Sequence, residues 1–342
     1  MPRRIIYRRY GEPSVLAVET FSNAAPTAHQ LTIDVAFSGI NFGDCIARRG
    51  FYSSAPKPPG CVGFEVSGTV SAVGSSVTTF KVGDRVLAVT RFGGYSSEVV
   101  VDAAYVSPIP NNMSFEDAAA IPAVYLTAWH SLYEIARARK GESILIQAVA
   151  GGVGIAALQL AKSLGLTTYG TASSDEKLEV AKSFGLDHGI NYARDEFKSK
   201  VLDLTQNDGV DIVLDSLGGE GFKKGYECLA RGGKIITIGA AQVAPAHRNL
   251  RGFATAAKEM VLGGIYQPLK LIQDNRTVSG VQILYWWDKT EHLSRGMREI
   301  LALYKRGIVR PVIDSIFTFD DVQAAHARLE SRVTKGKLLL RP

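Results

Sequence analysis

The feature that most constrains the fold is a run of 19 residues without a charged side chain, at 143–161. A run of this length is long enough to raise the question of a membrane span. Its middle contains a glycine cluster from Gly151 to Gly154, and Gln147 and Gln159 lie on either side. An apolar strand, a glycine turn and an apolar helix fit these residues better than one membrane helix. The sequence therefore predicts a soluble protein without a transmembrane segment.

Glycines in such a turn can serve a phosphate-binding site. Gly151 would let the backbone approach a pyrophosphate, and Gly154 would let the helix pack closely on the strand, with the phosphates over the positive helix end. The turn departs from the usual dinucleotide-binding pattern because Val149 stands in place of the first glycine. A turn of this kind can also be purely a packing device. The strands and helices around it favour a cofactor site, with the predicted residues Ala150, Gly151, Gly152, Val153 and Gly154.

The rest of the chain divides into a β-rich part and an alternating part. The length of 342 residues suffices for about two domains, and 46% hydrophobic with 21% charged residues excludes a disordered chain. Residues 1 to about 110 alternate apolar and polar side chains between glycine turns, which is typical of a small antiparallel barrel. Ser114 is predicted to cap a helix that Pro122 interrupts.

From residue 142 onward, short apolar runs alternate with longer helical patterns, which predicts a parallel sheet with helices on both faces. The predicted strands are 143–149, 167–171, 210–215, 233–238 and 278–284, and the helices between them begin near Gly152, Asp175, Asp195 and Gly221. Two further helices and a closing strand are predicted at 291–305, 319–331 and 337–340.

Charge and cysteine content narrow the possible partners. The 39 basic and 33 acidic residues give a net charge of +6, and the dense basic cluster at 3–9 flanks apolar residues of a predicted first strand. Nucleic-acid binding requires clustered charge interleaved with aromatic rings, so this pattern disfavours it. The three cysteines have no paired metal-binding spacing, and their odd number indicates reduced thiols in a cytoplasmic compartment; they are Cys45, Cys61 and Cys228.

The end of the second strand of the alternating part discriminates between the nicotinamide cofactors. An NAD site expects an acid about 20 residues beyond the glycines, where it binds the ribose 2′-hydroxyl. This strand ends without an acid at its tip; Asp175 and Glu176 follow it, and Ser173 and Glu176 have the spacing of a capping box. Lys177 can reach a 2′-phosphate, or it can be an ordinary exposed lysine. The pattern favours the phosphate role and hence NADPH.

These residues, taken with the front half, resemble the medium-chain dehydrogenase/reductase superfamily in its zinc-free quinone oxidoreductase branch. The motifs that carry the resemblance span nearly the whole chain: GINFGD at 39–44, PG at 59–60, GFEVSG at 63–68, VG at 73–74, FKVGDRV at 80–86, AGGVG at 150–154, GTAS at 170–173 with Lys177, and GK at 336–337. Within this branch, 210–219 and 301–315 resemble the homologues of vesicle amine transport protein.

The resemblance implies an α/β protein with a GroES-like, β-rich catalytic domain at 1–122 and 285–342, and an inserted Rossmann domain at 123–284 whose doubly wound parallel sheet binds NADPH. It also implies a homodimer, which we expect to pair through the strand at 278–284. Zinc-containing relatives place a cysteine at Asn41 and a histidine at Phe64, and neither an amide nor a phenyl ring holds zinc. The six histidines show no ligand spacing, so no metal is expected; they are His29, His130, His188, His247, His292 and His326.

The resemblance also assigns further cofactor contacts. The residues that fall where this branch binds the NADPH 2′-phosphate are Ser173, Lys177, Tyr192 and Arg332. The residues that match positions beside the nicotinamide are Thr127, Gly239 and Ala240.

The absence of zinc ligands restricts the chemistry. Reduction of a simple ketone generates alkoxide charge that requires zinc or a strong acid, whereas conjugate hydride addition to a quinone or enone spreads the charge over an enolate. Asn41 could donate a hydrogen bond to the acceptor oxygen, and Tyr52 could orient the substrate or deliver a proton through water. The alternative interpretations are a turn-capping amide and a half-buried aromatic ring. Asp44 and Arg48 are expected to order the loop.

Three functions follow as hypotheses. The first is an NADPH-dependent, zinc-independent oxidoreductase that transfers hydride to a quinone or an activated alkene. The second is an NADPH-binding adaptor at a vesicle or organelle surface, and the third is an RNA-binding, crystallin-like protein, for which the sequence offers only mild basicity. The acceptor stays open because the segments expected to shape its pocket, at 50–57, 242–252 and 285–288, match no substrate pattern.

Overall fold

The computed structural model describes residues 1–243 and 250–342. The chain divides into two compact units: unit 1 is Met1–Leu126 with Ile283–Pro342, and unit 2 is Thr127–Gln282. His247 and most of the predicted substrate segment at 242–252 lie outside the described residues. No helix within the described part of the chain is long and apolar enough to cross a membrane.

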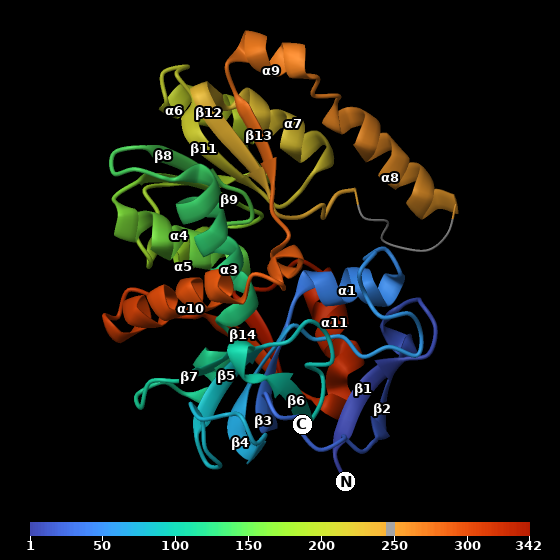
Figure 1. Cartoon of the computed structure of the whole chain (residues 1–342). Helices are drawn as coiled ribbons and strands as arrows, with labels where there is room; N and C mark the ends of the chain where they lie inside the picture. The colour runs from blue at the N-terminus through green and yellow to red at the C-terminus, as the bar shows by residue number, and fades with distance from the viewer. Residues whose placement is uncertain (244–249) are drawn as a thin grey trace. The chain divides into compact units, whose positions relative to one another are not determined.

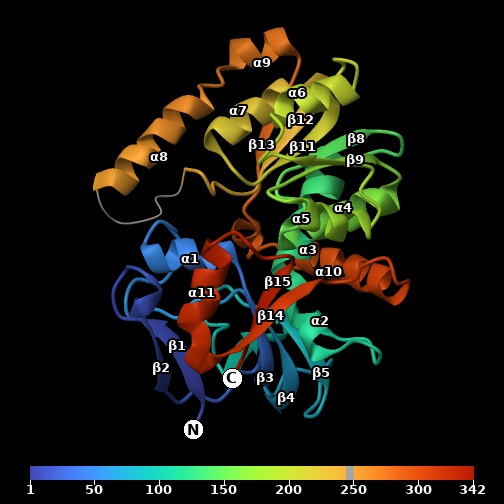
Figure 2. The same ribbon diagram turned by 180° about the vertical axis from the view of Figure 1, so that it is seen from behind.

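Unit 1 is built on a sheet that joins both ends of the chain. The strand order is β14-β15-β3-β4-β5-β7, and β6 also pairs with β3. The strands are β3 (Gln30–Ile40), β4 (Glu65–Val73), β5 (Arg85–Val89), β6 (Glu98–Asp102), β7 (Val106–Pro108), β14 (Ile313–Thr318) and β15 (Lys337–Arg341), and a separate hairpin pairs β1 (Arg3–Tyr7) with β2 (Leu16–Thr20). Figure 2 shows β15 within this sheet, and its pairing with β3 places both chain ends in one unit.

The alternation predicted for the first part of the chain is confirmed in β3. Leu31 and Ile33 are fully buried and pack with side chains of β4 such as Val66 and Val70. A second core in the same unit combines residues from both chain ends, including fully buried Phe319. Burial of large apolar side chains stabilises a fold by about 1.5 to 3 kcal/mol each, so both ends contribute to the stability of unit 1.

The two helices on either side of Pro122 begin where the sequence indicates, whereas the helix Phe42–Arg49 was not predicted. Ser114 accepts the backbone N–H of Asp117 at 3.0 Å and caps α2, and the next helix begins at Pro122, a position where the missing N–H of proline costs nothing. The helices are α1 (Phe42–Arg49), α2 (Phe115–Ala119), α3 (Pro122–Trp129), which continues into unit 2 as a π-helix (His130–Ala136), α10 (Thr290–Lys305) and α11 (Val322–Glu330).

Unit 2 contains the predicted parallel sheet. Its order is β10-β9-β8-β11-β12-β13, so the chain runs outward from β8 to one edge, returns to β11 and continues to the other edge. The strands are β8 (Ser143–Ile146), β9 (Thr167–Ala172), β10 (His188–Asn191), β11 (Val210–Asp215), β12 (Leu229–Thr237) and β13 (Thr277–Gly280), and all of them except β10 are labelled in Figure 1. The helices are α4 (Gly152–Leu164), α5 (Asp175–Lys182), α6 (Phe197–Leu204), α7 (Gly219–Glu227), α8 (Leu250–Gly263) and α9 (Pro268–Asp274).

The predicted strand at 278–284 is wrong in its second half. β13 ends at Gly280, and a 3₁₀ helix, Ile283–Trp286, follows. Val281 and Leu284 are buried while Tyr285 is exposed, and burial at a spacing of three matches a 3₁₀ turn rather than the alternation of a strand. The sequence reasoning also missed α8 and α9, which lie between β12 and β13 in the chain.

Candidate active site

The predicted glycine turn lies between β8 and α4. Gly151 is the N-cap of α4 and has an extended backbone, with φ −78° and ψ 170°. Among the described residues, no side chain caps this helix, so the N–H groups of its first turn are available to another acceptor. An anion at this helix end would bind them and meet the positive end of the helix dipole. The turn therefore fits the pyrophosphate of a dinucleotide.

Close packing in the turn explains its glycines. A Cβ at Gly154 would lie 2.3 Å from the carbonyl oxygen of Ala148, whereas at Gly151 it would lie 3.2 Å from the same atom. Val149, which departs from the usual pattern, is fully buried and lies where a Cβ at Gly170 would meet it at 2.8 Å. The missing glycine at position 149 is thus matched by a glycine on the neighbouring strand.

Three of the predicted 2′-phosphate residues follow β9 and β10 at the carboxyl ends of these two parallel strands. Ala172 and Asn191 end the two strands and are register partners. The N–H of Tyr192 donates to the carbonyl oxygen of Ala172 at 3.0 Å, so Tyr192 lies beside the point where Ser173 begins. Lys177 follows in the first turn of α5.

The predicted capping box of Ser173 and Glu176 is wrong. Ser174 is the N-cap of α5 and its hydroxyl accepts the N–H of Lys177 at 3.4 Å. The helix begins one residue later than a cap at Ser173 would require. The Ser173 side chain is therefore not the cap, which leaves it compatible with the phosphate role that the resemblance implies.

Sequence reasoning missed Arg194. Its guanidinium binds both carboxylate oxygens of Asp175, at 2.7 and 2.9 Å, and Asn191 donates to the same carboxylate at 3.1 Å. Asp175, the acid nearest the tip of β9, is thus paired with the Arg194 cation, so its carboxylate is not free to bind a ribose hydroxyl. The position of Arg194, two residues after Tyr192, was the available signal.

The turn at Gly239 and Ala240 follows β12 and lies against the loop after β11. A Cβ at Gly239 would lie 3.1 Å from the carbonyl oxygen of Ser216. Asp215, fully buried, accepts the N–H groups of Leu217 and Gly218 at 3.1 Å each. Burial raises the pKa of Asp215, and these hydrogen bonds oppose that rise. The predicted nicotinamide turn is therefore braced by a buried carboxyl group.

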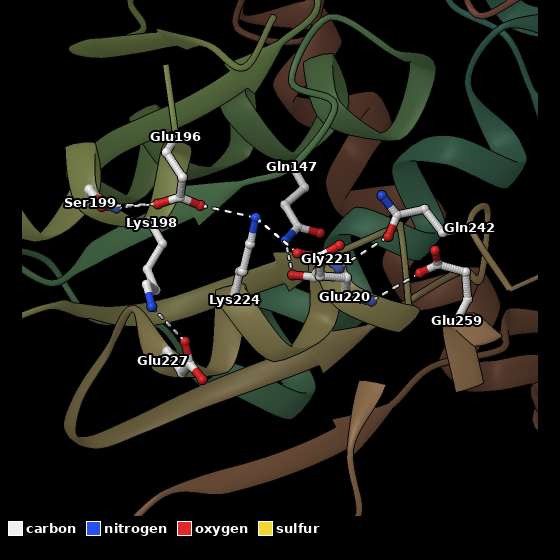
Figure 3. A network of polar contacts seen from close by, with 10 residues as sticks. All are labelled: Gln147, Glu196, Lys198, Ser199, Glu220, Gly221, Lys224, Glu227, Gln242 and Glu259. Atoms are coloured by element: carbon white, nitrogen blue, oxygen red, sulfur yellow. Dashed lines mark hydrogen bonds and ion pairs between the residues drawn. The ribbon is translucent and has the colours of Figure 1, made fainter. Parts of the chain in front are cut away.

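The network in Figure 3 holds α7 against the sheet. The side chain of Gln147, at the end of β8, donates to the carbonyl oxygen of Gly221 at 2.9 Å, and Gln242 accepts the N–H of Gly221 at 3.0 Å. Lys224 lies 3.2 Å from a carboxylate oxygen of Glu196, which joins α7 to the start of α6. The ends of β8 and β12 are thereby connected through one helix.

In unit 1, Asn41 is the N-cap of α1. Asp44 completes a capping box, in which its carboxylate accepts the Asn41 N–H at 2.8 Å; the same carboxylate accepts the N–H of Gly63 at 2.9 Å. The expectation that Asp44 orders this loop together with Arg48 needs correction: the ion pair of Arg48 is with Glu330 on α11. The Asp44 carboxylate thus joins the backbone of Asn41 to that of Gly63, and the Tyr95 side chain also donates a hydrogen bond to it.

The side chain of Asn41 lies in a buried polar cluster. Its Nδ2 donates to Oε1 of Glu65 at 2.9 Å, and its Oδ1 accepts from Nζ of Lys337 at 2.5 Å. Lys337 and Glu65 also form an ion pair at 2.5 Å, and their side chains are 4% and 0% exposed. Sequence reasoning missed this cluster, although the motifs GFEVSG and GK contain both charged residues.

Tyr52 belongs to an aromatic cluster with Phe64 and Phe92. The ring centroid of Tyr52 lies 6.0 Å from that of Phe64 and 6.3 Å from that of Phe92. A Cβ at Gly43 would lie 3.1 Å from the Phe64 ring and 3.5 Å from the Tyr52 ring, so the first turn of α1 leaves room for both. The Phe64 ring, at the position where zinc-containing relatives place a histidine, thus forms an apolar wall beside Tyr52.

Two further predicted cofactor residues belong to other elements of the chain. Arg332 follows α11 in unit 1, whereas Ser173, Lys177 and Tyr192 belong to unit 2. Thr127 is on α3 at the start of unit 2. Within residues 1–243 and 250–342, no group of three or more His, Cys, Asp or Glu side chains is placed to hold a metal ion.

The two units and the glycine turn have the architecture of a dinucleotide-binding oxidoreductase. Family models match at 27–111, for the alcohol dehydrogenase GroES-like domain, and at 152–288, for zinc-binding dehydrogenase. The chain is 34% identical to a quinone oxidoreductase of Pseudomonas aeruginosa over the full length of both. It is 38% identical to the synaptic vesicle membrane protein VAT-1 homolog of Danio rerio, over 91% of this chain and 64% of that protein, so it spans somewhat less than two thirds of that relative.

Solved structures agree with these relatives. The quinone oxidoreductase of Escherichia coli complexed with NADPH has a TM-score of 0.87 at 30% identity, covering 99% of this chain and 100% of that one. The CurK enoyl reductase has a TM-score of 0.85 at 26% identity, covering 99% of each chain. The chain belongs to the zinc-free quinone oxidoreductase branch of the medium-chain dehydrogenase/reductase superfamily.

Asp44 makes stability depend on pH. Burial raises its pKa from 3.8 to about 7, although the two backbone N–H groups and the Lys337 charge oppose the rise. The folded state therefore holds an additional proton between these values, and the stabilisation present below pH 3.8 is lost as the pH rises through 7. Relative to Asp44→Asn, the free energy of unfolding of the wild type should fall by up to about 4 kcal/mol across this range, at about 1.36 kcal/mol per pKa unit.

Urea unfolding at pH 4 to 8 measures this difference. The matched control is Asp84→Asn, because hydrogen bonds from Lys81 lower the pKa of that half-buried carboxyl, so its effect should be constant over the same range. A gap between wild type and Asp44→Asn that does not change with pH would contradict the prediction.

Proposed function

We propose that this protein is an NADPH-dependent, zinc-independent oxidoreductase that transfers hydride to a quinone or an activated alkene. The observation that carries the proposal is the uncapped N-terminus of α4 behind a turn that only glycine fits at position 154. A pyrophosphate is the ligand that such a helix end favours. A relative named quinone oxidoreductase and a similar structure named enoyl reductase support the acceptor class. A cytoplasmic location is part of the proposal.

NADPH fits the nucleotide end of the site better than NADH. The tip of β9 has no acid, and Asp175 is engaged by Arg194. Ser173, Lys177 and Tyr192 supply a hydroxyl, an ammonium and a phenol for the 2′-phosphate. When bound, NADPH would supply a nucleophilic hydride from its nicotinamide to an electrophilic carbon of the acceptor.

Asn41 and Tyr52 act on the acceptor in this proposal. Hydride addition to the β-carbon of an enone moves the double-bond electrons to the oxygen and forms an enolate. The Asn41 amide donates a hydrogen bond to that oxygen, and the apolar wall of Phe64 and Phe92 holds the Tyr52 ring. Tyr52 orients the acceptor or passes a proton to it through water. Holding the acceptor against the nicotinamide supplies most of the rate, worth about 7 kcal/mol or more.

Steady-state oxidation of NADPH with quinones, enones and aldehydes tests the function. We expect turnover with quinones or enones and none with simple aldehydes. Tyr52→Phe keeps the aromatic cluster but removes the hydroxyl, so it should slow enone reduction by roughly tenfold to a thousandfold, and quinone reduction less. Tyr304→Phe, which removes a hydroxyl bound to Asp117, is the matched control. NADPH binding without turnover of any acceptor would favour the adaptor function instead.

Lys177 should set cofactor preference. A charge-assisted contact contributes about 1.5 to 3 kcal/mol, so Lys177→Ala should weaken NADPH binding by roughly tenfold to a hundredfold and leave NADH binding almost unchanged. Lys182→Ala is the control, because Lys182 lies on the same helix and pairs with Glu179. Equal losses for both cofactors in a fluorescence titration would show that Lys177 acts on packing.

We infer that the homodimer pairs through β13 and the adjoining α9. Within the described sheet of unit 2, β13 is an edge strand with β12 as its neighbour, and the unpaired backbone groups of an open edge strand can pair with another chain. Ile265, Leu269 and Ile272 are 82%, 71% and 72% exposed in the single chain. A second copy related by a twofold axis would cover the edge and these side chains together.

Light scattering at micromolar concentration should find a dimer. Leu269→Asp combined with Ile272→Asp should produce a monomer, because carboxylates would be buried without partners. Gln273→Asp, an exposed change on the same helix, should remain dimeric. A monomeric wild type, or a double variant that stays dimeric, would move the interface elsewhere. Val281→Pro would not be a suitable test, because the N–H of Val281 donates to the Thr237 carbonyl oxygen at 2.9 Å and its loss would disturb unit 2 itself.

A further inference from the structure

Unit 1 contains a buried ion pair between Lys337 and Glu65. Lys337 begins β15 and Glu65 begins β4, the two strands that flank β3. Their side chains are 4% and 0% exposed, with Nζ and Oε1 at 2.5 Å. Burying two charges costs several kcal/mol each, and only close pairing with further hydrogen bonds offsets that cost. Because the cost and the gain nearly cancel, a contribution to stability does not by itself explain why this pair is buried.

Besides the ammonium of Lys337, two further donors bind the Glu65 carboxylate. Its Oε2 accepts the backbone N–H of Ala123 at 2.6 Å, and its Oε1 accepts from Nδ2 of Asn41 at 2.9 Å. A Cβ at Gly39 would lie 2.3 Å from Oε1, so the glycine on β3 makes room for the carboxylate. The position of the Glu65 carboxylate is therefore fixed by the backbone around it.

The pair fixes the orientation of the Asn41 amide. Lys337 donates to its Oδ1, and Glu65 accepts one N–H of its Nδ2. A rotation of the amide by 180° would place its NH₂ against the ammonium and its oxygen against the carboxylate, so only one orientation is allowed. One N–H of Nδ2 is left, since the amide carries two donors. An ammonium on the amide oxygen also polarises the amide and strengthens that N–H as a donor.

We propose that Lys337 and Glu65 are positioning residues, which orient and polarise the Asn41 amide so that its remaining N–H binds the acceptor oxygen during hydride transfer. This inference rests on the proposed function. The acceptor's β-carbon gains the hydride from NADPH, the double-bond electron pair moves onto oxygen, and a proton from solvent at the α-carbon completes the saturated product with NADP⁺. Asn41 keeps its proton throughout, and Lys337 and Glu65 do not contact the acceptor.

The test removes the charges of Lys337 and Glu65 together, so that neither is left buried without its partner. Lys337→Met by itself would leave the Glu65 carboxylate buried and unpaired, which is strongly destabilising. The double variant Lys337→Met with Glu65→Gln keeps the approximate shape of both side chains but removes both charges. It should bind NADPH as tightly as the wild type, measured by fluorescence. Single-turnover hydride transfer to an enone should slow by roughly tenfold to a hundredfold, because the acceptor oxygen loses a well-oriented donor. Transfer to a quinone should slow less.

A double-mutant cycle separates positioning from general damage. In an Asn41→Ala background, the Lys337→Met and Glu65→Gln changes should have no further effect on the rate, because they act through the amide. Lys81→Met, which removes an exposed ammonium paired with Asp84, is the control and should leave the rate unchanged. If the double variant does not fold, Lys337→Arg decides. It retains the buried cation but replaces the ammonium, so its enone rate should fall below that of the wild type without loss of NADPH binding.

Three results would overturn the inference. The first is an active wild type whose double variant, or Lys337→Arg where that variant decides, transfers hydride at the wild-type rate with both acceptors. The second is an effect of the double variant that persists in full in the Asn41→Ala background. The third is a wild type that reduces no quinone or enone, in which case the proposed function fails and the inference fails with it.

Discussion

The buried ion pair of Glu65 and Lys337 is the constraint on which the geometry around Asn41 depends. It connects β4 in the first part of the chain to β15 at the C-terminal end, and both strands flank β3. Removing one partner of a buried pair typically costs about 3 to 5 kcal/mol, a large share of the stability of a domain. The chain ends are therefore held together by charge as well as by the apolar core around Phe319. Because Asn41 hydrogen-bonds both partners, the same pair also links the sheet to the start of α1.

Unit 2 depends on steric fit rather than on buried charge. Gly154 allows α4 to lie against the carbonyl oxygen of Ala148, and Gly170 allows Val149 to fill the space beside β9. These contacts set the position of the helix N-terminus at which we place the pyrophosphate. Buried polar groups brace the neighbouring loops, most directly Asp215, whose carboxylate accepts two backbone N–H groups. Each unit thus presents one rigid element to the proposed chemistry: an amide in unit 1 and a helix end in unit 2.

Local patterns made most of the fold predictable. The run at 143–161 predicted the strand, turn and helix, and the alternation of strands and helices predicted the parallel sheet. The errors occurred where neighbours in space overrode local spacing. Ser173 and Ser174 offer equivalent hydroxyls, and only the path of the backbone selects Ser174 as the cap. The apolar residues at 281–284 read as strand, although their burial has the spacing of a 3₁₀ turn.

The sequence offers candidate site residues one at a time but not the contacts between them. Asn41 and Tyr52 were proposed from their motif and segment, whereas Glu65 and Lys337 lie far apart in the chain and no local pattern pairs them. Arg194 and Asp175 are a second pair of this kind. Non-local charge pairs depend on strand order and register, which the sequence alone leaves open.

The proposed function requires that hydride pass from a bound nicotinamide to a carbon of an activated acceptor. NADPH that carries deuterium at the reactive position of the nicotinamide C4 tests this transfer, with an enone as acceptor and mass and NMR analysis of the product. We expect deuterium at the β-carbon of the saturated product, and hydrogen from solvent at the α-carbon. A saturated product without deuterium at the β-carbon, or bound cofactor with no transfer to any quinone or enone, would contradict it.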